Sequence, residues 1–136
     1  MPRPALSRKN WPLTKSSSHF GRQAEEEAAR YLQERGFTLK TRNYRHGSRE
    51  IDLIMEKDDL LVFVEVKASR GQSFGSPESW VTPAKQKNII TAALAYIQKH
   101  DIRDREIRFD VITCHGQGSE LKLNHLPAAF DASANL

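Results

Sequence analysis

The chain has 136 residues, a single cysteine and a formal net charge of +4. This length suits one domain with a core of its own, and a single cysteine excludes an internal disulfide and favours a reducing compartment. The positive excess comes from residues 1–20, which hold four basic residues and no acid, so the rest of the chain is balanced in charge.

Residues 1–19 are therefore predicted to form a disordered basic tail outside the folded domain. The alternative is a basic arm that binds a phosphate backbone. Pro2, Pro4 and Pro12 break up the apolar core that a secretion signal needs, and no apolar stretch approaches the length of a membrane span. We expect a soluble cytoplasmic protein that does not associate with a membrane.

The first predicted helix runs from the cap candidates Ser16–Ser18 to Gly36, which ends it. Within Glu25–Glu27, the middle acid falls opposite the apolar stripe of this helix, while the first and third flank it. Either flanking acid could face a site beside a sheet, and the spacing does not choose between them. Three solvated acids near a helix start are an equal alternative. The stripe consists of Phe20, Ala24, Ala28, Tyr31 and Leu32.

Three strands are predicted next, as an antiparallel meander. The first covers Phe37–Tyr44, and the second contains Glu50 and Asp52. The third, Leu60–Ala68, is rich in branched apolar residues and reads as an interior strand. Glu65, Val66 and Lys67 place two charges in this strand, and burying an unpaired charge costs several kcal/mol.

Residues 57–60, Lys-Asp-Asp-Leu, have the composition of a hairpin turn. If the two aspartates form a two-residue loop, the register places Asp52 opposite Glu65 and Glu50 opposite Lys67. Because residues two apart share a face of a strand, one face would then hold three carboxylates and one ammonium group. A three-residue loop would shift the register and separate them.

Two carboxylates directly across a sheet repel each other, and a divalent cation would remove the conflict. Mg²⁺ commonly takes one or two carboxylates together with water and phosphate oxygens, so Asp52 and Glu65 are candidate ligands. Lys67 could then hold a phosphate oxygen or position an attacking water. The alternative is a solvated sheet face crossed by ion pairs, of which Glu50 with Lys67 is the most obvious.

A loop over residues 69–81 leads to a second helix, with Thr82 as cap and Pro83 at the first helical position, that ends near His100. The cations in its first turn oppose the helix dipole, as a helix start facing phosphate would, although solvated lysines are the alternative. Strands at Ile107–Cys114 and Glu120–Leu126 follow. We predict an α/β fold, a mixed sheet with order α-β-β-β-α-β-(β) and helices packed on it, formed by residues 20–126 and followed by a tail at 127–136.

These residues, in this order, resemble the PD-(D/E)xK nuclease superfamily with its restriction-endonuclease-like core. More closely, the chain resembles the YraN-like family of small bacterial proteins regarded as endonucleases. The matching motifs span about residues 20–115; they are Gly21-Arg22, Glu25, Ala28, Tyr31-Leu32, Arg42-Asn43, Glu50-Ile51-Asp52-Leu53-Ile54, Leu61-Val62-Phe63-Val64-Glu65-Val66-Lys67, Phe74-Gly75, Lys85-Gln86 and Arg108-Phe109-Asp110-Val111.

The resemblance implies a Mg²⁺- or Mn²⁺-dependent endonuclease that hydrolyses DNA phosphodiester bonds. Asp52, Glu65 and Lys67 match the catalytic Asp, Glu and Lys of the superfamily, and the Val66 carbonyl would complete the metal site. The helix glutamate of the family falls on Glu25, which would support a bound water or a second cation. Further residues implied, as contacts to the nucleic-acid backbone, are Arg42, Lys85 and Gln86.

A comparison with Holliday-junction resolvases, which are similarly small, implies branched DNA from recombination or repair as substrate. It also implies a homodimer, of which the sequence itself gives no sign. The alternative is a non-catalytic nucleic-acid-binding or repair-accessory protein on the same fold. That alternative predicts binding that survives the loss of Asp52 and no cleavage with any metal.

Overall fold

The computed structural model describes residues 19–69, 80–116 and 120–132. The cap candidates Ser16–Ser18, the rest of the expected N-terminal tail and most of the expected loop at 69–81 lie outside these residues. The elements follow the predicted order: α2 (His19–Glu34), β1 (Thr38–His46), β2 (Arg49–Lys57), β3 (Leu60–Ser69), α3 (Pro83–Lys99), β4 (Glu106–His115) and β5 (Lys122–Phe130).

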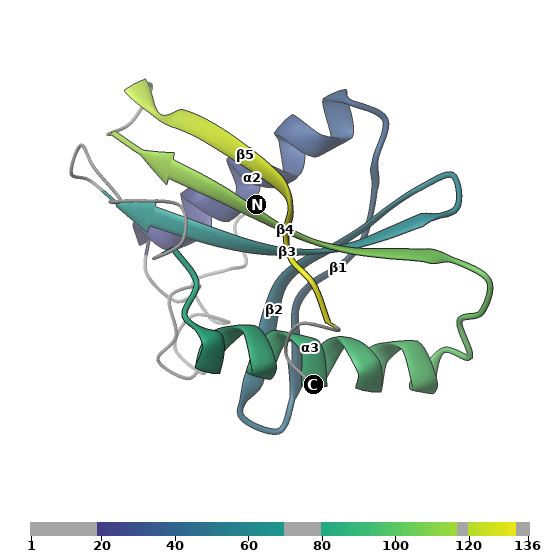
Figure 1. Cartoon of the computed structure of the whole chain (residues 1–136). Helices are drawn as coiled ribbons and strands as arrows, with labels where there is room; N and C mark the ends of the chain where they lie inside the picture. The colour runs from purple at the N-terminus through teal and green to yellow at the C-terminus, as the bar shows by residue number, and fades with distance from the viewer. Residues whose placement is uncertain (1–18, 70–79, 117–119, 133–136) are drawn as a thin grey trace, which may run out of the picture.

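One mixed sheet contains all five strands in the order β1-β2-β3-β4-β5. β1, β2 and β3 form the predicted antiparallel meander. β3 and β4 are parallel, since α3 lies between them in the chain and carries it back across the sheet, and β5 returns antiparallel to β4. Figure 1 shows α2 and α3 on opposite faces of this sheet. The mixed α/β architecture is therefore confirmed.

Both faces of the sheet are buried, which explains why β3 is apolar along most of its length. Successive residues of β3 point alternately to the two helices: Val62 and Val64 belong to the core on the α2 side, and Leu61 and Phe63 to the core on the α3 side. Small residues of α2, such as Ala24 and Ala28, are fully buried and let this helix approach the sheet closely.

The C-terminal end of α2 and both ends of α3 agree with the predictions. Gly36, with a φ of 96°, follows α2, and its N–H donates to the carbonyl of Gln33. Thr82 caps α3, its hydroxyl accepting a hydrogen bond from the Lys85 N–H at 3.2 Å, and His100 follows the last helical residue.

The last strand differs from the prediction, which placed it at Glu120–Leu126. β5 runs to Phe130, through Pro127 and Ala128, which resemble a tail in the sequence. Proline is tolerated here because β5 is an edge strand. The Ala128 backbone has a φ of 52°, and its N–H donates to the Asp110 carboxylate rather than to a neighbouring strand.

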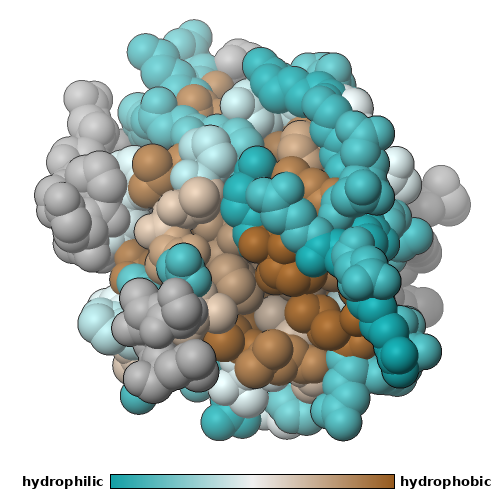
Figure 2. Space-filling view, turned by 45° about the vertical axis from the view of Figure 1, so that its right-hand side comes forward, coloured by the Kyte–Doolittle hydropathy of each residue, from teal (hydrophilic) through white to brown (hydrophobic). Residues whose placement is uncertain are grey.

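Apolar side chains gather on one surface of the protein (Figure 2). Leu94 is a large apolar residue that is 54% exposed. It borders a groove between α3 and the last two strands, which is also lined by Ile97, Ile107, Phe109 and Phe130. No helix among residues 19–69, 80–116 and 120–132 is long and apolar enough to cross a bilayer.

Candidate active site

A pocket of about 480 Å³ opens where β2 and β3 separate beside the start of α3. The predicted residues Asp52, Glu65 and Lys67 all line it, as does Lys85 from α3. The structure thus brings together residues that lie up to 33 positions apart in the chain. The other lining residues are Ser48, Arg49, Glu50, Trp80, Val81, Thr82 and Asn88.

The predicted hairpin register is confirmed. The two-residue turn lies at Asp58 and Asp59, the first of which has a φ of 55°, and Lys57 pairs with Leu60. The pairing continues as far as Leu53 with Val64. One step further, the same register sets Asp52 opposite Glu65.

Beyond the pair Leu53–Val64, the Asp52 side chain takes the place of a β2 backbone carbonyl as hydrogen-bond acceptor for β3. Its side chain is only 2% exposed, and its Oδ2 accepts a hydrogen bond of 2.7 Å from the Val66 N–H. In a continued ladder Val66 would lie opposite Ile51. The carboxylate therefore holds the two strands together where their backbones separate, and this contact fixes its place in the pocket.

Glu65 is 3% exposed, so two carboxylates from neighbouring strands are buried in one pocket. Lys85 lies 4.0 Å from the Glu65 Oε2, measured from its Nζ. This lysine comes from the first turn of α3, where it opposes the helix dipole, and the nearby carboxylate offsets that cost. Lys67 is partly exposed at the same pocket.

Glu50 also lines the pocket, but its ion-pair partner is Arg45, at 3.8 Å, where the ion-paired alternative expected Lys67. The predicted grouping of three carboxylates and one lysine around one space is therefore present. Within the described residues, however, no group of three or more His, Cys, Asp or Glu side chains is arranged to hold a metal ion.

Of the three adjacent acids on α2, Glu25 is the buried one, at 4% exposed. Glu26 is exposed, and Glu27 pairs with Arg30 on the surface. The Glu25 Oε1 accepts a hydrogen bond of 3.1 Å from Asn43 Nδ2. Glu25 does not line the pocket that holds Asp52 and Glu65.

Of the three residues expected to contact a nucleic-acid backbone, only one lines the pocket. Lys85 faces the pocket, whereas Arg42 is exposed on β1 away from it, and Gln86 donates through Nε2 to the Val81 carbonyl at 3.0 Å. Sequence reasoning missed Trp80 and Asn88, which line the pocket. Their signal was positional: Asn88 lies one helical turn after Lys85 and so shares its face of α3.

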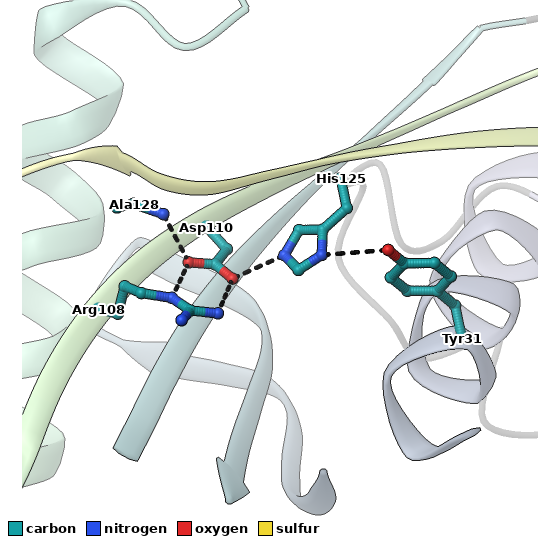
Figure 3. Close-up of polar contacts among 5 residues, drawn as sticks. All are labelled: Tyr31, Arg108, Asp110, His125 and Ala128. Carbon is teal, nitrogen blue, oxygen red and sulfur yellow. Dashed lines mark hydrogen bonds and ion pairs between the residues drawn. The ribbon is translucent and has the colours of Figure 1, made fainter. Parts of the chain in front are cut away.

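A second polar cluster, also missed, lies on the α2 side of the sheet (Figure 3). The fully buried Asp110 of β4 receives two hydrogen bonds of 2.8 Å from Arg108, one of 3.0 Å from the Ala128 N–H and one of 2.7 Å from His125 Nε2. The other nitrogen of His125 lies 3.3 Å from the Tyr31 hydroxyl on α2.

This cluster ties two strands to a helix. A carboxylate only accepts hydrogen bonds, so His125 Nε2 is the donor in the bond to Asp110. Burial raises the pKa of Asp110, but the hydrogen bonds from His125, Arg108 and Ala128 outweigh it, and the pKa lies below its usual value. The hydrogen bond to Asp110 in turn raises the pKa of Arg108.

A family model described as "Uncharacterised protein family UPF0102" matches residues 24–114, which include β1 to β3, α3 and nearly all of β4. A UPF0102 protein of Myxococcus xanthus is 41% identical over 113 residues, covering 83% of this chain and 90% of the relative. A UPF0102 protein of Syntrophomonas wolfei is 43% identical over 111 residues, covering 82% and 96%. One from Phocaeicola vulgatus is 37% identical over 113 residues, covering 83% and 93%.

Proposed function

This chain belongs to the uncharacterised protein family UPF0102, and we propose that it is a metal-dependent endonuclease that hydrolyses DNA phosphodiester bonds. The observation that carries the proposal is the pocket in which two buried carboxylates, Asp52 and Glu65, meet Lys67 and Lys85. Buried acids and cations in one cleft are typical of a reactive site more than of a structural core.

The donor set fits a hard divalent cation. Asp52 and Glu65 offer carboxylate oxygens from adjacent strands. Val66 belongs to the core on the α2 side and is not among the residues that line the pocket, so of this residue only the backbone carbonyl, which the resemblance implies, would add a third oxygen. Two protein carboxylates are fewer than a structural ion normally takes. Mg²⁺ and Mn²⁺ accept such sets when water and substrate phosphate supply the remaining ligands.

When bound, the cation would polarise the phosphoryl group and make water more acidic. The protein's own residues would do the rest. Lys67 would hold the attacking water in line with the phosphorus and offset charge that develops on the phosphate oxygens. Lys85 would hold a neighbouring phosphate through its ammonium group. Glu25, which does not line the pocket, would act through Asn43.

The fold is consistent with a restriction-endonuclease-like core, since it contains an antiparallel meander, a crossing helix and a parallel fourth strand. Branched DNA is our proposed substrate class, on the resemblance to junction resolvases. A homodimer, which the same resemblance implies, and a cytoplasmic location, which the sequence predicts, both stay predictions.

The test incubates the full chain with Mg²⁺, Mn²⁺ or EDTA and with labelled duplex, single-stranded, flap and four-way-junction DNA. Asp52→Asn keeps an oxygen that can accept from the Val66 N–H while it removes the charge, so it should fold and yet cut at least about a hundredfold more slowly. Lys67→Ala should lose a similar factor, and Lys85→Ala about tenfold.

Lys87→Ala is the matched control for Lys85, because Lys87 is an exposed lysine of the same helix that does not line the pocket. It should retain full activity. Cleavage that persists undiminished in both Asp52→Asn and Lys67→Ala would refute the site. DNA binding without cleavage of any substrate, unchanged in Asp52→Asn, would instead identify a non-catalytic accessory protein.

A further inference from the structure

In the hairpin of β1 and β2, the side chains switch from one face of the sheet to the other at a single position. Residues two apart on a strand normally share a face, yet Leu53 belongs to the core on the α2 side and Ile51 to the core on the α3 side. Their partners on β1, Arg42 and Tyr44, flank Asn43 without a register shift. The change therefore occurs where Asn43 lies opposite Asp52.

Asn43 provides the geometric cause. Its φ of 48° is left-handed, a conformation that costs most residues about 1–2 kcal/mol and that asparagine tolerates best after glycine. This conformation rotates the strand about its axis. The Asn43 amide also donates to the buried Glu25 carboxylate at 3.1 Å, so helix α2 holds the residue that makes the rotation.

The rotation has a direct consequence for the pocket. The backbone pairing of β2 with β3 ends at Leu53 and Val64. The Asp52 carboxylate then accepts a hydrogen bond of 2.7 Å from the Val66 N–H. Without the rotation at Asn43, ordinary alternation would continue along β2, and the ladder could run on past Asp52. Its carboxylate would then lose the backbone donor that sets its position.

We propose that Asn43 and Glu25 form a positioning pair that sets Asp52 in the pocket. Glu25 is then a support of the hairpin rather than a ligand of the cation. The effect on metal affinity rests on the proposed function, but the effect on Asp52 placement does not. The two parts can therefore be measured separately.

The first measurement needs no metal. Amide hydrogen exchange at Val66 reports the bond to Asp52, and Val64, on the paired part of β3, is the internal reference. In Asn43→Gly, which permits the left-handed backbone but lacks the amide, and in Glu25→Ala, exchange at Val66 should quicken about tenfold relative to Val64. Glu25→Gln keeps an oxygen for Asn43 and should stay near the wild type.

The second measurement titrates the same metal-free proteins with Mn²⁺ by calorimetry. Losing an outer support of a metal ligand costs about 10–100-fold in affinity, so Asn43→Gly and Glu25→Ala should bind Mn²⁺ at least about tenfold more weakly. Glu25→Gln should bind within about twofold of the wild type, because a support needs only the hydrogen bond. A direct ligand would need the charge.

The outcomes separate the two proposals. Unchanged exchange at Val66 in both Asn43→Gly and Glu25→Ala overturns the positioning pair, whatever the metal does. Glu25→Gln as deficient in Mn²⁺ binding as Glu25→Ala, with normal exchange at Val66, overturns it in favour of a direct ligand. A wild type that binds no Mn²⁺ while the exchange results hold overturns the metal-dependent function and leaves the positioning of Asp52 established.

Discussion

Replacing Asp110 by asparagine should destabilise the protein strongly at neutral pH. Asp110 is fully buried and accepts from Arg108, His125 and the Ala128 N–H. An asparagine keeps one accepting oxygen and turns a donor group toward other donors. Breaking a buried ion pair costs about 3–5 kcal/mol. Arg108 is 25% exposed and can regain water, so we expect the lower end, about 3 kcal/mol, or about 10 °C in Tm.

The stability lost on replacing Asp110 should depend on pH. The pKa of Asp110 is lowered in the folded protein, so the carboxylate stabilises the fold fully above its ordinary value of about 3.9 and loses this effect as the pH falls through the lower folded value. Urea unfolding of wild type and Asp110→Asn should therefore differ most at pH 7 and begin to converge only below about pH 4.

Glu106→Gln is the matched control, since Glu106 is an exposed carboxylate at the start of the same strand. It should change stability by less than about 0.5 kcal/mol. The reasoning is refuted if Asp110→Asn costs no more than this control at pH 7. It is also refuted if the difference between Asp110→Asn and wild type is as large at pH 3 as at pH 7.

Three further predictions concern stability and reactivity. A Cβ on Gly116 would lie 2.5 Å from the Glu120 carbonyl oxygen, whereas one on Gly47 meets nothing; thermal melts should show Gly116→Ala at least about 2 kcal/mol less stable than Gly47→Ala. The hydrogen bond from Arg105 lowers the pKa of the partly exposed Glu56, so Glu56→Gln should cost under about 1 kcal/mol, less in 0.5 M salt and less as the pH falls through its folded pKa. Equal losses in low and high salt would contradict this. Cys114 is fully buried, so a thiol reagent should modify it slowly in the native protein and quickly in urea; fast native labelling would contradict its burial.

The pocket was predictable in outline because its residues violate a local pattern. Charged Glu65 and Lys67 stand in an apolar strand, and a two-residue turn aligns that strand with Asp52 by simple counting. Local chemistry likewise identified Thr82 as a cap and Gly36 as a helix stop. Each of these inferences needed only neighbours in sequence or one hairpin.

The cluster around Asp110 had no such signal. Tyr31 and His125 are 94 residues apart, and their contact exists only because an edge strand passes beside α2. The strand that carries His125 looked too short, since Pro127 and Ala128 suggested a tail. In β5 the Ala128 N–H donates to the Asp110 carboxylate and not to a backbone carbonyl of β4. The alternation of apolar and polar residues gives no sign of such a strand.

Asn43 is intermediate between the pocket, which the sequence predicted, and the Asp110 cluster, which it did not. The alternation of side chains along the strands predicted correctly that Glu50, Asp52 and Glu65 gather around one pocket. For Asp52 this reason is incomplete, because the side chains of β2 change faces at Asp52, one pair beyond the last backbone pair of β2 with β3. What places Asp52 is a left-handed asparagine held by a buried glutamate from a helix on the other face of the sheet. Local counting finds which residues meet, whereas the contact between Asn43 and Glu25 decides how firmly Asp52 is held.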